Sequence, residues 1–242
     1  MSQIKNIFRF LGFEITKSRS ERRTLFQAVK HLKNLGFKPE LVIDAGVAHG
    51  TPGIYENYPD SKLLLIEPLQ EFKKSLELIC NKYSKFISIE KALTSYEGKL
   101  QLFVKKSKSG SSQFKSENED IIEKRSVDTV TLKSLLSEYY VGGSILLKMD
   151  IEGGELDVIL NSKDELKFVD VVILEVTFLP RLEGCPSFTS VMKVMIDYGF
   201  EVFDIVDKRY YEKSKNLFQS DMVFVKKESF LRRNSNHESI IG

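Results

Sequence analysis

The sequence has few cysteines and no long uninterrupted apolar run. Its two cysteines, Cys80 and Cys185, are too few for a disulfide framework and lack metal-ligand spacing. No stretch approaches the roughly 18 apolar residues that a membrane-spanning helix needs. Lys5 and Arg9 interrupt the first apolar segment, which therefore does not resemble a secretion signal. We accordingly expect a cytoplasmic protein.

The chain also has no internal repeat, no low-complexity tract and no linker rich in proline, glycine or serine. Its 242 residues are 42% hydrophobic and 29% charged, which excludes a disordered or fibrous chain. This length suits one α/β domain. We predict a helical N-terminal extension over 1–40, a main domain over 41–226 and a tail over 227–242.

Charge is distributed unevenly along the chain. Residues 1–40 carry nine Lys and Arg against three Glu, whereas residues 41–225 carry more acidic than basic residues. The basic N-terminus could contact an anionic membrane surface, although a solvated end is the simpler interpretation. No blocks of basic and aromatic residues resemble a nucleic-acid-binding module, so we expect no nucleic-acid partner.

Short apolar runs alternate with helical patterns after the N-terminal segment. Runs such as LVID, SILLK and VDVVILEV are almost continuously apolar, which is typical of parallel strands covered on both faces. Helical patterns over Glu71–Asn81 and Phe188–Tyr198 lie between such runs. This alternation predicts a Rossmann-like, seven-stranded, mostly parallel sheet with helices on both faces. The predicted strands are Leu41–Ala45, Leu63–Ile66, Phe86–Ile89, Ile145–Met149, Val169–Val176, Glu201–Val206 and Met222–Val225.

One stretch departs from this alternation. The segments Gly98–Val104 and Ser126–Val130 flank a polar stretch, and we interpret them as antiparallel strands joined by an exposed loop. Long loops of this kind often cover binding sites.

The turn after the first predicted strand has the features of a nucleotide site. Gly46 and Gly50 allow a tight turn and a close backbone approach to a ligand. Glu67 ends the second strand at the spacing of an acidic residue that accepts hydrogen bonds from a ribose diol. A purely structural glycine turn is the alternative. The third glycine of a dinucleotide motif is missing, and Asp44 before the turn suits a cationic amino-acid group. S-adenosylmethionine is therefore favoured over NAD.

A second group of carboxylates is predicted at the same edge of the sheet. Asp150 and Glu152 follow the fourth main strand, and Glu175 lies near the end of the next. Converging acids need a cationic partner, which Lys148, a ligand ammonium or a metal could supply. A charge network that only closes the sheet is the alternative.

The strings VIDAGVAHG, LLLIEPLQEF and LLKMDIEGGELDVI together resemble the FkbM-type methyltransferases. These are S-adenosylmethionine-dependent O-methyltransferases that act largely on sugars and natural products. KALTSYEGKLQLFV, SGSSQF, VDTVTLKSLL, VVILEV, DYGFEVF and QSDMVFV follow in the expected order. The resemblance covers roughly residues 36–225 and implies the class I methyltransferase fold. His49 departs from the asparagine or arginine that the family often carries.

The resemblance implies a role for each of several residues. It places the methionine end of the cofactor at the glycine turn, the ribose at Glu67 and the reacting methyl group near Asp150. The implied cofactor-binding residues are Asp44, Gly46, Ala48, Gly50, Glu67, Pro68, Lys91, Ala92 and Asp150.

Transfer of a methyl group to a hydroxyl requires alignment of the reactants and removal of a proton. Asp150 and Glu152 are the leading candidates for the base, with Glu175 in support and His49 as an alternative base. These three carboxylates could also hold Mg²⁺. The expected acceptor is a small molecule or glycan, such as a saccharide, a glycolipid or a secondary metabolite.

Two other functions remain open at this point. A non-catalytic scaffold or binding module would keep the fold, but it has no use for clustered acids. An NAD(P)-dependent oxidoreductase would lack its glycine motif and a proton-relay motif. Acceptor specificity is expected in the loops Ser107–Asp120, Leu179–Ser187 and Asp207–Gln219, and the oligomeric state is not predicted.

Overall fold

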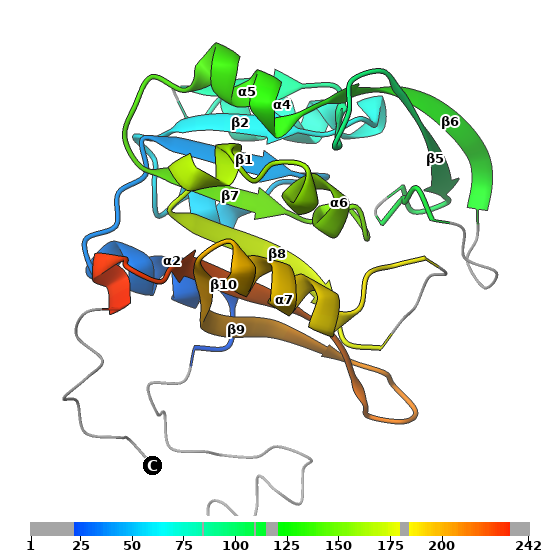
Figure 1. Ribbon diagram of the computed structural model, residues 1–242. Coiled ribbons are helices and arrows are strands. Elements are labelled where there is room, and N and C mark those ends of the chain that lie inside the picture. Colours follow the sequence, from blue (N-terminus) through cyan, green and yellow to red (C-terminus); the bar gives the residue numbers. More distant parts are fainter. Residues whose placement is uncertain (1–21, 84, 109, 115–120, 180–183, 233–242) are drawn as a thin grey trace, which may run out of the picture.

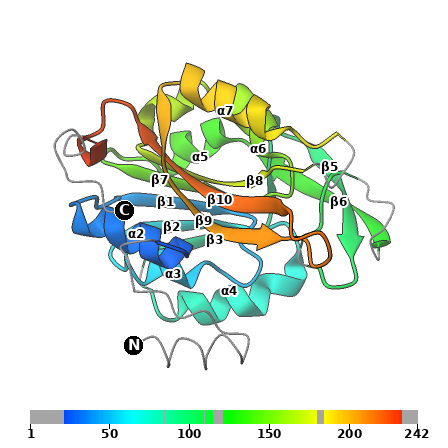
Figure 2. The same ribbon diagram turned by 90° about the horizontal axis from the view of Figure 1, so that it is seen from below.

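The computed structural model describes residues 22–232, apart from 84, 109, 115–120 and 180–183. A seven-stranded sheet forms the centre, in the order β3-β2-β1-β7-β8-β10-β9, with helices on both faces (Figures 1 and 2). This confirms the predicted Rossmann-like architecture. Most of the predicted N-terminal extension and C-terminal tail lies outside the described residues.

The sheet is parallel across five neighbouring strands, whereas β10 runs antiparallel to both β8 and β9. Every residue of β1 and β7 is buried, as the continuous apolar runs predicted. The strands of this sheet are β1 (Leu41–Ala45), β2 (Lys62–Ile66), β3 (Phe86–Ile89), β7 (Ile145–Met149), β8 (Val171–Thr177), β9 (Phe200–Tyr210) and β10 (Leu217–Lys226). The last two are longer than predicted because polar residues occupy their ends.

Each face of the sheet buries its own hydrophobic cluster. Figure 2 shows α2 (Leu25–Asn34), α3 (Pro52–Tyr55) and α4 (Lys73–Cys80) on one side of the sheet. The other side carries α5 (Leu132–Tyr139), α6 (Glu155–Leu160) and α7 (Phe188–Asp197). The short helices η1 (Gln70–Phe72), η2 (Glu165–Phe168) and η3 (Phe230–Arg232) complete the described helices.

Helix α2 lies in the described part of the predicted N-terminal extension, residues 22–40. Thr24 caps it and forms a capping box with Gln27. Its buried face, which includes Val29 and Leu32, packs in the same cluster as Val42 of β1. None of the described helices combines the length and apolar character that crossing a bilayer requires.

A second sheet lies beyond the carboxyl ends of the parallel strands (Figure 1). It contains β4 (Ala92–Leu93), β5 (Lys99–Lys105) and β6 (Ile121–Val130). Strands β5 and β6 pair antiparallel, which confirms the predicted excursion from the alternating pattern. The two-residue strand β4 was not predicted, because it is too short to show a periodicity.

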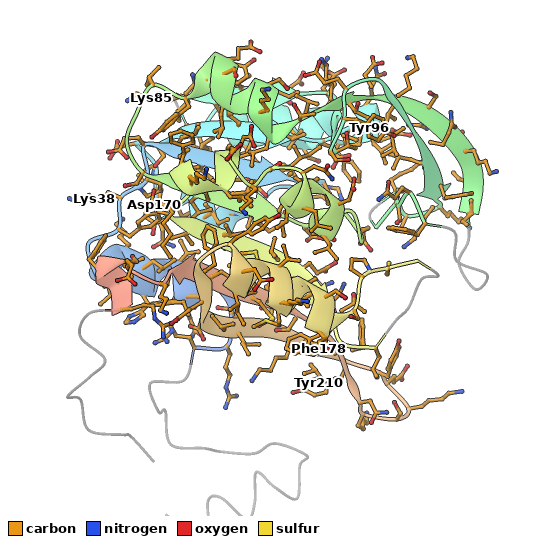
Figure 3. All side chains as sticks on the ribbon, in the orientation of Figure 1. Lys38, Lys85, Tyr96, Asp170, Phe178 and Tyr210 are labelled. Atoms are coloured by element: carbon orange, nitrogen blue, oxygen red, sulfur yellow. The ribbon has the colours of Figure 1, made fainter. Side chains whose placement is uncertain are left out.

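The parallel strands end at one edge of the molecule. Figure 3 shows Lys38 and Asp170, which precede β1 and β8, at the opposite end of the sheet from Phe178 and Tyr210. Ligands of open α/β sheets bind at the carboxyl ends of the strands. The functional site is therefore expected at the edge near Phe178 and Tyr210.

The turn after β1 passes very close to the turn after β7. The Asp150 amide donates a hydrogen bond to the Ala45 carbonyl at 3.0 Å. Gly46 has a φ of +76°, and a Cβ atom there would lie 1.7 Å from the Asp150 carbonyl oxygen. Glycine is therefore required at this position by both backbone conformation and space.

The turn between β7 and α6 is held by a buried carboxylate. Glu155 accepts hydrogen bonds from the backbone amides of Ile151, at 2.8 Å, and Gly153, at 2.9 Å. These bonds hold Glu152 at a φ of +55°. Burial raises the pKa of Glu155 to about 7, and the charges of Asp150 and Glu152 act in the same direction.

Gly46→Ala should destabilise the fold by about 1–3 kcal/mol more than Gly36→Ala. Gly36 has a φ of +98° but open space where a Cβ atom would lie, so its replacement measures the conformational cost alone. Equilibrium unfolding in urea measures the free energy of unfolding of both variants. Equal losses would contradict the steric account of the Gly46 turn.

The free energy of unfolding should fall between pH 5 and pH 8. Over most of this range folded Glu155 keeps a proton that the unfolded chain has released, so rising pH favours unfolding. Glu155→Gln should reduce the fall by about 2–3 kcal/mol. Urea unfolding at both pH values tests this, with the exposed Glu77→Gln as a control that keeps the wild-type difference. If the free energy of unfolding of Glu155→Gln falls by as much as that of the wild type, Glu155 is not the cause of the pH dependence.

Candidate active site

A cavity of about 560 Å³ lies at the carboxyl ends of the parallel strands, between the main sheet and the second sheet. This volume is within the range of small-molecule sites. One side of the cavity is apolar and includes Leu69, Phe72, Ala92, Leu100 and Leu102. The other side is polar and includes Lys148, Asp150, Glu152, Glu175, Arg209 and Asp221.

Unusual backbone conformations are concentrated at this cavity. Five non-glycine residues in the described part of the chain have a positive φ: Ala48, Lys108, Glu152, Asp207 and Lys215. All except Lys215 line the cavity. Positive φ values at residues with a Cβ atom are strained and cluster at functional sites. The strained backbone conformations and the charged side chains therefore occur at the same cavity.

Glu67 lies at the end of β2, where the sequence predicted a ribose-binding carboxylate. Its two oxygens accept hydrogen bonds from the Ala48 amide at 2.9 Å and the Leu69 amide at 3.0 Å. Only 6% of the residue is exposed, and burial raises the pKa of its carboxyl group. Each carboxylate oxygen retains a second acceptor position, so Glu67 can also receive hydroxyl groups from a ligand in the cavity.

Most of the predicted cofactor-binding residues line this one cavity: Gly46, Ala48, Gly50, Glu67, Pro68, Ala92 and Asp150. Asp44 and Lys91 do not belong to the lining. Lys91 is exposed outside it, whereas Asp44 is fully buried behind the glycine turn and accepts a hydrogen bond from the Tyr55 hydroxyl. Direct cofactor contacts by these two residues remain predictions that the geometry does not support.

The three predicted carboxylates come together at the polar side. Asp150, Glu152 and Glu175 each place one carboxylate oxygen within 4.8 Å of the others. Glu175 is the most buried of the three. Burial raises the pKa of Glu175, and repulsion by Asp150 and Glu152 raises it further, whereas Arg209 opposes the rise.

Two cations already face these carboxylates. The Lys148 ammonium lies 3.5 Å from Asp150 Oδ2, and Arg209 Nη1 lies 2.8 Å from Glu175 Oε1. Oxygen ligands of this kind suit Mg²⁺. Much of the charge that a metal would neutralise is therefore balanced by side chains. The three carboxylates could still hold a metal together with these cations.

Sequence reasoning missed the contribution of β9 and β10. Arg209 Nη1 also donates to Gln219 Oε1 at 2.9 Å, and Asp221 pairs in register with Glu175. Burial raises the pKa of Asp221 to about 6, although Lys148 acts against this rise. We expected the region from Asp207 to Gln219 to be a specificity loop, but its two ends are strands. Antiparallel register, which brings these residues to the site, has no signature in the local sequence.

His49 lines the cavity from the turn after β1. Its Nδ1 atom lies 3.2 Å from the Ser75 hydroxyl of α4, and its ring packs edge-on against Phe72. These contacts place it beside α4, and its described hydrogen bond is not to a carboxylate. A role as alternative base remains a prediction.

The loop after β5 reaches over the cavity. Lys108, Gly110, Ser111 and Gln113 contribute to the lining, and the Ser112 hydroxyl donates to the Glu152 carbonyl at 2.7 Å. This part of the predicted loop Ser107–Asp120 therefore contacts the site. Residues 115–120, and 180–183 of the second predicted loop, lie outside the described residues.

Comparison with known proteins identifies related sequences and folds. The model of the methyltransferase FkbM domain matches residues 44–202. A search of the curated proteins finds no match.

Three solved structures illustrate the similarity in fold. Precorrin-6y C5,15-methyltransferase from Geobacter metallireducens is 13% identical, with a TM-score of 0.44 over 88% of this chain and 92% of that one. Magnesium protoporphyrin IX methyltransferase from Synechocystis is 10% identical, with a TM-score of 0.43 over 93% and 96%. The fibrillarin pre-rRNA processing protein of Methanococcus jannaschii is 10% identical, with a TM-score of 0.47 over 80% and 68%.

The family match covers more than half of the chain, from the end of β1 into β9, and it contains the two turns that form the cavity. The chain belongs to the family of methyltransferases with an FkbM domain.

Proposed function

We propose that this protein transfers a methyl group from S-adenosylmethionine to a hydroxyl of a small molecule or glycan, such as a saccharide, a glycolipid or a secondary metabolite. One observation carries the proposal. A single cavity joins the ribose-type carboxylate Glu67 to Lys148 and Asp150, the charged pair after β7. The cofactor and the acceptor can therefore meet in one cavity.

The cavity residues suit the parts of the cofactor. Leu69, Phe72 and Ala92 offer an apolar surface for the adenine, next to Glu67 for the ribose. Gly46 and Gly50 line the cavity on the turn after β1, where the proposal places the methionine tail. When bound, S-adenosylmethionine supplies an electrophilic methyl group on a positively charged sulfur. The acidic side of the cavity favours this positive charge.

The reaction requires a residue that accepts a proton. The acceptor O–H bond breaks and its proton passes to a carboxylate, while the oxygen forms a bond to the methyl carbon. The bond between this carbon and sulfur breaks, and its electron pair stays on the sulfur. Asp150 is the favoured proton acceptor because it lines the cavity next to Lys148, whereas Arg209 already engages Glu175. Glu152 is the second candidate.

Specific observations weigh against the two other functions. A scaffold would gain nothing from strained cavity residues such as Ala48 and Glu152. An oxidoreductase would need a pyrophosphate cradle, but acidic side chains line the end of the cavity beyond Gly46. A cytoplasmic location and contact of the basic N-terminus with a membrane belong to this proposal as expectations.

S-adenosylmethionine and S-adenosylhomocysteine should each raise the melting temperature, whereas NADH at the same concentration should not. A ligand at 100 times its dissociation constant adds about 2.7 kcal/mol of stability. Glu67→Gln should reduce the shift because a ribose-binding acceptor is lost, and the exposed Glu77→Gln should keep it. A shift with NADH alone would contradict the proposal.

Incubation with methyl-labelled S-adenosylmethionine and fractionated cell extract should label a small molecule or glycan as a methyl ether. Mass spectrometry and NMR locate the methyl group. Asp150→Asn should lower labelling by about 100-fold or more, the size of a lost general base. Labelling on nitrogen or carbon would contradict O-methylation. A parallel reaction in excess chelator tests the metal, because undiminished labelling would exclude a need for Mg²⁺.

A further inference from the structure

Lys148 is a buried ammonium whose hydrogen bonds are incompletely made. Only 5% of the residue is exposed, and it lines the cavity. Among the residues that the structure describes, its single hydrogen bond is the 3.5 Å contact with Asp150, and Asp44 Oδ1 is 3.7 Å away. An ammonium has three donors, and both distances exceed those of a good charged hydrogen bond.

The carboxylate behind Lys148 shows the same deficit. Asp44 Oδ1 is buried and has no hydrogen-bond partner among the described residues. A buried charge that lacks full hydrogen bonding is costly unless a ligand completes it. The arrangement therefore keeps Lys148 charged without using all its donors. Burial lowers the pKa of Lys148, but attraction by Asp44, Asp150 and Asp221 outweighs this and raises it overall.

The hydrogen-bonding capacities of Lys148 and Asp150 indicate which ligand group can bind between them. Lys148 only donates hydrogen bonds, and ionised Asp150 only accepts them. A hydroxyl does both, so it can bridge the two side chains at the same oxygen. A carboxylate ligand would instead meet the negative charges that already surround Lys148, and an ammonium ligand would be repelled by it.

We propose that Lys148 is a catalytic residue that donates a hydrogen bond to the acceptor oxygen while Asp150 takes the proton from the same hydroxyl. The inference rests on the proposed function, because it places the reacting methyl group beside this pair. Lys148 stabilises the negative charge that develops on the oxygen as the O–H bond breaks. No charge accumulates on Lys148, which keeps its proton throughout.

The test measures affinities by calorimetry for S-adenosylmethionine, S-adenosylhomocysteine and 5′-methylthioadenosine. The first carries the positive sulfur, the second lacks that charge, and the third also lacks the amino-acid tail. Lys148→Met should leave binding of the two neutral-sulfur compounds within about threefold. It should raise the ratio of S-adenosylmethionine affinity to S-adenosylhomocysteine affinity by about fivefold or more, because a cation near the sulfur is removed.

Two control variants test whether the ratio of S-adenosylmethionine affinity to S-adenosylhomocysteine affinity reports charge near the sulfur. Asp150→Asn should change it in the opposite direction, because an anion near the sulfur is removed. Lys99→Met removes a lysine side chain that is 67% exposed and paired with Asp128, and should change nothing. Lys148→Met leaves buried carboxylates uncompensated, so the double variant Lys148→Met/Asp44→Asn repeats the measurement with one fewer buried negative charge.

Each other outcome overturns the inference in a distinct way. Loss of S-adenosylhomocysteine binding with retained methylthioadenosine binding would assign Lys148 to the carboxylate of the amino-acid tail. If Lys148→Met and Lys148→Met/Asp44→Asn both bind all three compounds more weakly by the same factor, Lys148 has a structural role. If the ratio of S-adenosylmethionine affinity to S-adenosylhomocysteine affinity does not change, Lys148 lies away from the methyl group. If the wild-type protein binds none of the three, the proposed function itself fails.

Discussion

The parallel pairing of β1 with β7 is the constraint on which the site depends. Its register sets Asp44 opposite Lys148 and ends both strands at the same level. The two following turns then meet so closely that only Gly46 fits against the Asp150 carbonyl. One pairing thus fixes the proposed cofactor-binding turn, the buried ion pair and the candidate base together. The apolar residues of both strands, buried on both faces, supply the stability that holds this arrangement.

The polar side of the cavity is a balance of buried charges. Carboxylates from β1, from the turn after β7, and from β8 and β10 surround one ammonium, and Arg209 adds a second cation from β9. Four of the five described non-glycine residues with positive φ are also at this cavity. Charge burial and backbone strain both reduce stability, and the protein concentrates both where the proposed reaction occurs. This is the physical basis for treating the cavity as an active site.

The sequence predicts the parts of this structure that local pattern determines. The continuous apolar runs identify the central strands, and the positions of Gly46 and Glu67 in the sequence predict that both residues lie at one site, where they line the cavity. The antiparallel register of β9 and β10 is not predictable in this way, so Arg209 and Asp221 were missed. Asp44 was expected at the ligand, but whether a side chain at a strand end faces a cavity or the core depends on packing around it. Tyr55, which covers Asp44, comes from a four-residue helix with no clear signal in the sequence.

The central claim is that one cavity binds the cofactor with its ribose at Glu67 and its reacting group at Lys148 and Asp150. A crystal structure of the protein with S-adenosylhomocysteine tests it most directly. The account predicts that the ribose hydroxyls donate to the Glu67 carboxylate, and that the sulfur faces the space beside Lys148 and Asp150. Binding in another cavity, or in this one with the sulfur directed away from that pair, would contradict it.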